Sequence, residues 1–207
     1  MAEARSKSST APRRLILASA SAARRTMLDT AGVDFEVIPA NIDERAIEQA
    51  NDASPPSTVA AILAEAKAIE VSVRHPNAVV IGSDQVLAFD GAILHKAPDL
   101  QGARLALGRL AGRTHELHSA AVIASGGRPV WRYVATARLA MHRLSTDEID
   151  AYLGRVGSRV LSSVGCYELE GFGVRLFEAI EGDYFTVLGM PLLPLLGALR
   201  ERGMLDI

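Results

Sequence analysis

A carboxylate at the end of an apolar run is the feature of this sequence that points most directly to chemistry. Residues 79–81 are Val, Val and Ile, and Gly82, Ser83 and Asp84 follow before apolar residues resume. Removing an unpaired carboxylate from water costs on the order of several kcal/mol, so Asp84 needs a lysine, a metal ion or a bound substrate beside it. The alternative is a turn aspartate that caps nearby backbone amides beside Gly82.

The scarcity of lysine draws attention to two further positions. The chain has 22 basic residues, of which only Lys7, Lys67 and Lys96 are lysines. Lys67 falls within a helical pattern and Lys96 follows the turn after Asp84, so both could reach one cleft. A compact ammonium acts as a point charge on a phosphate or a carboxylate where a wide guanidinium does not fit. The alternative is that both lysines are ordinary solvated surface residues.

Small residues and hydroxyls connect a short apolar strand to a helix at residues 17–25. Backbone amides at such a helix N-terminus attract anions, and phosphate is the ligand that we expect beside Ser21. Arg24, one turn into the helix, could add planar contacts to phosphate oxygens, or it could simply be solvated.

Acidic residues offer candidate metal ligands. Glu44 follows an apolar strand pattern, and together with Asp84 it could supply hard oxygen ligands for Mg²⁺ or Mn²⁺. A solvated loop carboxylate is the alternative for Glu44. The five histidines lack zinc-site spacing, and we expect His115 and His118 to be strand residues.

Apolar periodicity predicts the elements that must position these residues. Strands are expected at residues 15–18, 35–38, 79–89, 92–94, 116–124 and 130–142. Helices are expected after caps at Ser21, Ser57, Asp99 and Ser145, and from Pro191. Asp90-Gly91 predicts a two-residue hairpin. The alternation indicates an α/β fold with a mixed β-sheet flanked by helices and two lobes around a cleft.

The composition limits the class of protein. The chain has 207 residues, 49% of them hydrophobic, and a formal net charge of -2. We expect a disordered tail at residues 1–12 and a single domain over residues 13–207. The near-neutral charge argues against nucleic acid polymers, and no apolar run reaches the ~20 residues of a membrane span. The lone Cys166 is interpreted as structural and fits a cytoplasmic location.

Ordered motifs along nearly the whole chain resemble the Maf family of nucleotide pyrophosphatases, from about residue 15 to about residue 202. They are LASASAARR, FEVIPANIDE, AEAKA, VIGSDQVLAFDGAILHK, GRTHELHSA and CYELEGFGVRLFEAIEGDYFTVLGMPL. The resemblance implies an α/β fold like that of inosine triphosphate pyrophosphatases. It also implies hydrolysis of a nucleoside triphosphate between its α and β phosphates, which releases a nucleoside monophosphate and pyrophosphate.

The resemblance further implies roles for individual residues. Asp84 matches the family's proton-accepting aspartate. The residues that match its phosphate-binding set are Ser21, Arg24, Lys67 and Lys96. Glu44 and Asp84 match its binding site for a divalent cation, Mg²⁺ or Mn²⁺. A homodimer is also implied.

Base preference is the finest point of the resemblance. Gln85 and Glu170 match the branch that acts on 7-methyl-GTP, and a carboxylate suits the N1 and N2 donors of guanine. Ala23 stands where the family has a large residue that shapes the base pocket, and residues 182–184 resemble the dTTP and UTP branch instead. Three functions remain open: house-cleaning hydrolysis of 7-methyl-GTP, a dTTP/UTP or broad-specificity pyrophosphatase, and a nucleotide-binding regulator of septum formation.

Overall fold

The computed structural model describes residues 14–206, so the tail predicted at residues 1–12 lies outside the described residues. A seven-stranded sheet forms the centre, with the order β2-β1-β3-β5-β6-β7 and with β4 paired to β3. Its strands are β1 (Leu15–Leu17), β2 (Glu36–Val37), β3 (Val79–Phe89), β4 (Ala92–Leu94), β5 (Thr114–Ser125), β6 (Arg128–Met141) and β7 (Phe177–Glu181). The pairs β1–β2 and β1–β3 are parallel and the others are antiparallel, which confirms the predicted mixed sheet.

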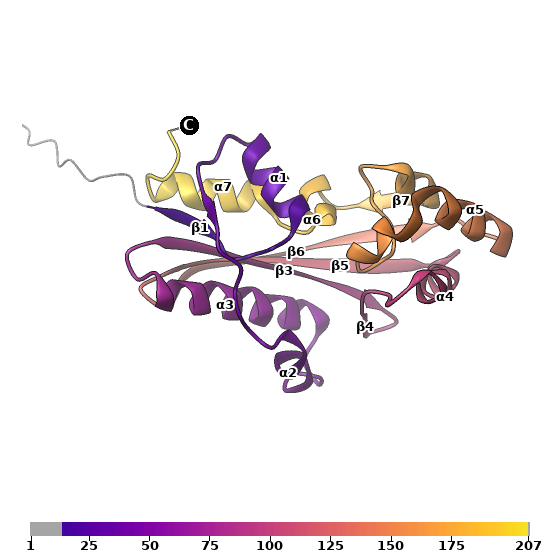
Figure 1. Ribbon diagram of the computed structural model, residues 1–207, viewed down its shortest axis with the longest axis horizontal. Helices are drawn as coiled ribbons and strands as arrows, with labels where there is room; N and C mark the ends of the chain where they lie inside the picture. Colours follow the sequence, from indigo (N-terminus) through magenta and orange to yellow (C-terminus); the bar gives the residue numbers. More distant parts are fainter. Residues whose placement is uncertain (1–13, 207) are drawn as a thin grey trace, which may run out of the picture.

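Helices cover both faces of the sheet. They are α1 (Ala22–Thr30), α2 (Glu44–Gln49), α3 (Pro56–Arg74), α4 (Leu100–Leu110), α5 (Thr146–Val156), α6 (Tyr184–Leu188) and α7 (Leu192–Glu201), with 3-10 turns η1 (Gly157–Ser162) and η2 (Phe172–Leu176). Figure 1 shows α3 along one face and α1 and α7 on the other. In the region described, no helix is both long and apolar enough to cross a bilayer.

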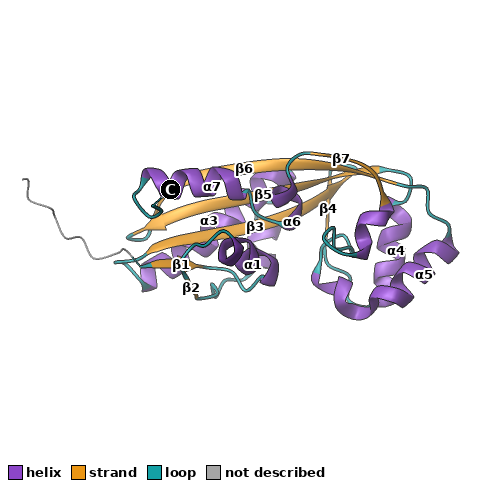
Figure 2. Cartoon of the chain, turned by 90° about the horizontal axis from the view of Figure 1, so that it is seen from above, coloured by secondary structure: helices purple, strands orange, loops and turns teal. Residues whose placement is uncertain are grey.

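Two of the apolar cores correspond to the two predicted lobes. One core gathers α4, α5 and the adjoining strand ends, and it includes Leu87 and Leu117. Another gathers β1, α1 and α7, and it includes Ile81 and Ile123. Figure 2 shows α4 and α5 together at one end of the sheet, away from α1 and α7. Strands β3 and β5 run through both cores, so the lobes share one sheet.

The sheet has an opening along β3. β1 pairs with β3 as far as Ile81, and β4 pairs with it only from Leu87 onward. Within the described residues, positions 82–86 therefore have a neighbouring strand only on the β5 side. Successive side chains of a strand point to opposite faces, so this one opening exposes Asp84 on the α3 face and Gln85 on the other.

Gly82 lets α3 pack unusually close to this opening. A Cβ atom added at Gly82 would lie 2.1 Å from the Ala64 carbonyl oxygen and 2.6 Å from the Ala68 backbone nitrogen. Only a residue without a side chain fits there. Because Lys67 lies within this turn of α3, the close packing brings its side chain beside Asp84.

Several local expectations are confirmed and one is wrong. The Asp90-Gly91 hairpin has positive φ at both residues, 53° and 77°, as a tight two-residue turn requires. The capping box of Ser145 is present at the start of α5. Ser57 is not the cap of α3, because the helix begins at Pro56, and proline is favoured in a first turn where its missing N–H costs nothing.

Candidate active site

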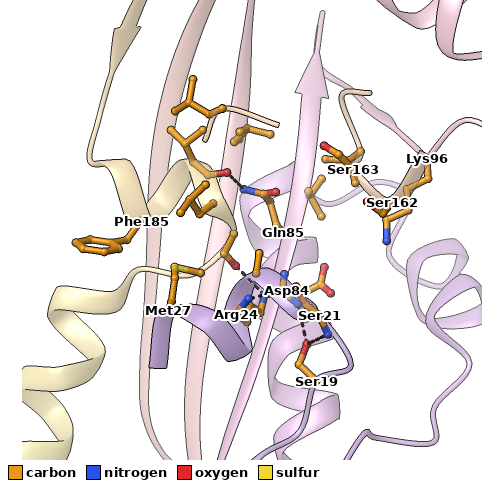
Figure 3. Close-up of a pocket in the computed structure, with 18 of the residues that line it drawn as sticks. Ser19, Ser21, Arg24, Met27, Asp84, Gln85, Lys96, Ser162, Ser163 and Phe185 are labelled. Atoms are coloured by element: carbon orange, nitrogen blue, oxygen red, sulfur yellow. Dashed lines mark hydrogen bonds between the residues drawn. The ribbon is translucent and has the colours of Figure 1, made fainter. Parts of the chain in front are cut away.

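A cleft of about 1960 Å³ lies at the opening in the sheet. The residues that the sequence predicted for the site all line it: Ser21, Ala23, Arg24, Glu44, Lys67, Asp84, Gln85, Lys96 and Glu170. They come from α1, α2, α3, β3, the segment after β4 and the segment before η2. Figure 3 shows several of them around one hollow. The volume is ample for a nucleotide, since ordinary ligand pockets measure roughly 300–1,000 Å³.

Lys67 joins the two acidic residues of the cleft. Its Nζ lies 2.5 Å from an oxygen of Asp84 and 2.9 Å from an oxygen of Glu44. The side chains of Lys67 and Asp84 are each 10% exposed, whereas that of Glu44 is 51% exposed. The lysine offsets the cost of burying the Asp84 carboxylate. Asp84 lies inside β3, so the alternative of a turn aspartate is wrong.

Arg24 is buried at the start of α1. Its Nε donates to the Gly189 carbonyl at 2.9 Å and its Nη1 donates to Ser19 Oγ at 3.1 Å. Burial lowers the pKa of Arg24, while the nearby charges of Asp84 and Glu44 oppose that shift. An arginine side chain stays charged in a protein even when burial lowers its pKa, so Arg24 is a fixed cation of the site. The alternative interpretation, a solvated arginine, is wrong.

Ser21 caps α1 by accepting a hydrogen bond from the Arg24 backbone nitrogen. Ser19 was not among the residues predicted for the site. Ser19 is 6% exposed, and its Oγ accepts bonds from the Arg24 side chain and the Ser21 backbone. The only available signal was a hydroxyl two residues before the cap.

Gln85 lies on the face of the sheet opposite to Asp84. Its amide nitrogen lies 3.0 Å from Ser119 Oγ and from the carbonyls of Thr186 and Val187 in α6. Lys96 and Glu170 also line the cleft, but both are exposed. Among the ion pairs of residues 14–206, neither Lys96 nor Glu170 has a partner.

The carboxylates of the cleft fit a cation bound together with substrate. Within residues 14–206 no group of three or more His, Cys, Asp or Glu residues could hold a metal ion alone. Glu44 and Asp84 nevertheless converge on a single point, the Lys67 ammonium. Mg²⁺ commonly takes only one or two protein carboxylates and completes its shell with phosphate oxygens and water. Two carboxylates at this position match that mode of binding.

A buried histidine supports the wall of the cleft at Tyr167. His115 Nε2 lies 2.6 Å from Tyr167 Oη, and His115 Nδ1 is buried without a hydrogen-bond partner among the described residues. Burial lowers the pKa of His115 to about 4. His115 and His118 both lie in β5, as expected. Cys166 is buried, and burial raises the pKa of its thiol, which agrees with a structural residue.

Comparison with known proteins finds similar sequences that match nearly the whole chain. Residues 14–202 match the family model described as Maf-like protein. A 7-methyl-GTP pyrophosphatase of Rhizobium etli is 51% identical over 93% of this chain and 98% of its own length. A nucleoside triphosphate pyrophosphatase of Granulibacter bethesdensis is 52% identical over 94% of this chain and 100% of its own length.

One solved structure shows a looser similarity. It is a dITP/XTP pyrophosphatase of Mycobacterium abscessus, with 15% identity and a TM-score of 0.42 over 92% of this chain and 95% of that chain. The family model covers nearly all the described residues, and the two relatives are aligned along almost their full lengths. This chain therefore belongs to the Maf family.

Proposed function

We propose that this protein is a nucleoside triphosphate pyrophosphatase that releases a nucleoside monophosphate and pyrophosphate. The observation that carries the proposal is the ion-paired Asp84, Lys67 and Glu44 in a cleft that also holds the N-terminus of α1. Relatives about half identical to this chain are named as pyrophosphatases of nucleotides, which supports the same chemistry here.

The residues predicted for catalysis and for phosphate binding each have a role in this reaction. Asp84 accepts a proton from a water molecule whose oxygen attacks the α-phosphorus. The bond from that phosphorus to the bridging oxygen breaks, and pyrophosphate leaves with the electron pair. Lys67 pairs with Asp84 and orients it, while Arg24, Ser21, Lys96 and the first amides of α1 bind phosphate oxygens. Positioning and charge stabilisation supply most of the rate in such a mechanism.

We further propose that Glu44 and Asp84 bind a divalent cation, Mg²⁺ or Mn²⁺, together with the substrate. When bound there, the cation neutralises charge on the phosphate oxygens. Lys67 already contacts both carboxylates, so it holds them near each other before substrate arrives.

The preferred substrate that we propose is 7-methyl-GTP, a modified nucleotide that a house-cleaning enzyme would remove. Gln85 and Glu170 both line the cleft, and Glu170 offers a carboxylate to the guanine edge. The relatives named 7-methyl-GTP pyrophosphatase support this preference. The small Ala23 leaves space for other bases, which keeps a broader pyrophosphatase as the second candidate.

The test is pyrophosphate release from 7-methyl-GTP, GTP, dTTP, UTP and CTP with Mg²⁺ or Mn²⁺. We expect the highest kcat/KM for 7-methyl-GTP and loss of release from every substrate in Asp84→Asn. Asp90→Asn is the matched control, because Asp90 directly follows the last residue of the same strand and pairs with exposed Arg113. Preference for dTTP or UTP would replace the base assignment, and no release by the wild type would favour a nucleotide-binding regulator.

A further inference from the structure

The last carbonyls of α6 are held by side chains from the neighbouring strands. Gln85 Nε2 lies 3.0 Å from the Thr186 and Val187 carbonyl oxygens and 3.0 Å from Ser119 Oγ. Ser119 Oγ in turn lies 2.7 Å from the Thr186 carbonyl oxygen, to which it donates. Ser119 is fully buried in β5.

These contacts determine which end of the Gln85 amide faces α6. Both carbonyl oxygens can only accept hydrogen bonds, and the single proton of the Ser119 hydroxyl is used on Thr186. All three neighbours therefore present lone pairs to Gln85. Only the NH₂ end of the amide, which has two protons to share among these acceptors, can donate to them, because Oε1 in that place would face three acceptors without a donor.

Gln85 Oε1 is consequently left toward the cleft. Figure 3 shows the amide nitrogen at the hydrogen-bonded end of Gln85 and the oxygen at the other end. Within the described residues, His115 Nδ1 is the one fully buried side-chain nitrogen or oxygen that lacks a hydrogen-bond partner. Gln85 Oε1 also has no partner among these residues, so it is not fully buried, and Gln85 lines the cleft. A Cβ added at Gly189 would lie 3.7 Å from this oxygen and 3.6 Å from Arg24 Nη2, so Gly189 lies beside both side chains.

We propose that Ser119 is a positioning residue that holds Gln85 as a hydrogen-bond acceptor, so that the cleft selects a base with an N–H donor at that edge. This inference rests on the proposed function and deepens it. Guanine and 7-methylguanine carry a proton on N1, whereas adenine N1 and cytosine N3 are acceptors. A site built to bond a donor rejects a base that lacks it more strongly than a site built on shape alone.

The experiment compares GTP with 2-aminopurine riboside triphosphate, which keeps the 2-amino group but lacks the N1 proton and O6. The measured quantity is the ratio of the two kcat/KM values. We expect the wild type to favour GTP and Ser119→Ala to lower that ratio about fivefold, mainly through KM, which is the effect of about one hydrogen bond. Ser119→Thr keeps the hydroxyl and should restore the ratio.

Ser83→Ala is the matched control. Ser83 is also a fully buried serine, and its hydroxyl bonds to the Ala120 and Gly189 carbonyls without touching Gln85. Its loss should affect both nucleotides alike and leave the ratio unchanged. Gln85→Leu is a second variant, because leucine is similar in size but carries no hydrogen-bond acceptor, so the ratio should also fall.

The outcomes separate this inference from the function on which it rests. An unchanged ratio in both Ser119→Ala and Gln85→Leu, with GTP still hydrolysed, would overturn the positioning role alone. An equal fall of the ratio in Ser83→Ala would also overturn it, because general loosening of α6 would then explain the effect. Absence of hydrolysis of every triphosphate by the wild type would overturn the proposed function itself.

Discussion

Lys67 is the residue on which the state of the cleft depends most. It is buried between Asp84 and Glu44, and it neutralises a carboxylate that water cannot reach freely. Removing one partner of a buried ion pair leaves the other charge uncompensated, which typically costs about 3–5 kcal/mol. The presence of a lysine at this position therefore has a structural reason.

We predict that Lys67→Ala lowers kcat at least about 100-fold and the free energy of unfolding by about 3 kcal/mol. Lys96→Ala is the matched control, because Lys96 lines the same cleft but is exposed. It should raise KM for the triphosphate and change the free energy of unfolding by less than about 0.5 kcal/mol. Steady-state kinetics and urea unfolding measure both. Wild-type kcat in Lys67→Ala would contradict the role given to Lys67.

Buried His115 makes the stability of the protein depend on pH. Burial lowers the pKa of His115 from its ordinary value of 6.5 to about 4. Between these pH values the unfolded chain binds a proton that the folded chain does not, so the free energy of unfolding falls as the pH falls from 6.5 toward 4. The loss attributable to this group is up to about 3 kcal/mol.

Urea unfolding at pH 7.5 and pH 5 measures this effect. His115→Gln keeps a polar partner for Tyr167 but does not titrate, so its stability should change less between the two pH values than that of the wild type. His142→Gln, at an exposed histidine, is the control and should follow the wild type. Equal pH dependence in wild type and His115→Gln would show that His115 is not buried in its neutral form.

Residue types, spacing and the family resemblance predicted nine residues that line the cleft, but they missed Ser19 and most of the contacts between these residues. Asp84 and the lysines stood out because a charge in an apolar strand and a rare residue type are visible locally. The bond between His115 and Tyr167 joins residues 52 positions apart, and that between Gln85 and Thr186 joins residues 101 positions apart. Such pairs depend on tertiary folding, which local patterns do not encode.

The contact between α3 and β3 sets the geometry of the cleft. We predict that Gly82→Ala lowers the free energy of unfolding by about 3 kcal/mol or more, because the added methyl meets backbone atoms of α3 that cannot rotate away. It should also reduce kcat, since a displaced α3 carries Lys67 away from Asp84. Urea unfolding and pyrophosphate release measure the two effects.

Gly108→Ala provides the matched control for Gly82→Ala. Gly108 lies within α4, and a Cβ added there meets no atom within 4 Å. Alanine is the better helix former, so this change should raise the free energy of unfolding by about 0.5–1 kcal/mol. A tolerated Gly82→Ala would show that α3 can move without disturbing the cleft.

The longer helices were predictable and the shortest helices were not. Residues 79–89 and the Asp90-Gly91 turn carry strong local signals, and β3 with its hairpin is confirmed. Helices α2 and α6 have only six and five residues, too few to show a helical repeat. They begin at aspartate caps, Asp43 and Asp183, and those caps were the signal that could have revealed them.

For the whole molecule, the shared sheet predicts one cooperative unit over the described residues. Strands β3 and β5 contribute to the cores of both lobes, so neither lobe can lose its core while the other keeps its strands. We therefore predict that the chain forms a single domain. Far-UV circular dichroism and the fluorescence of the sole tryptophan, Trp131, should give the same urea midpoint.

Trp131 makes this comparison informative because it packs against the core around β1 and α7, while circular dichroism reports helices of both lobes. Two different midpoints would mean that the lobes unfold separately. The outcome also bears on function, since residues from both lobes line the cleft and their spacing is fixed only if the sheet stays intact.

The most direct test of the proposed chemistry is the identity of the products. Wild type and Asp84→Asn are incubated with 7-methyl-GTP and Mg²⁺, and the phosphorus-containing products are resolved by ³¹P NMR. We predict that the wild type forms 7-methyl-GMP and pyrophosphate in equal amounts and that Asp84→Asn forms neither. Release of orthophosphate with 7-methyl-GDP, or full activity in Asp84→Asn, would contradict cleavage between the α and β phosphates by this cleft.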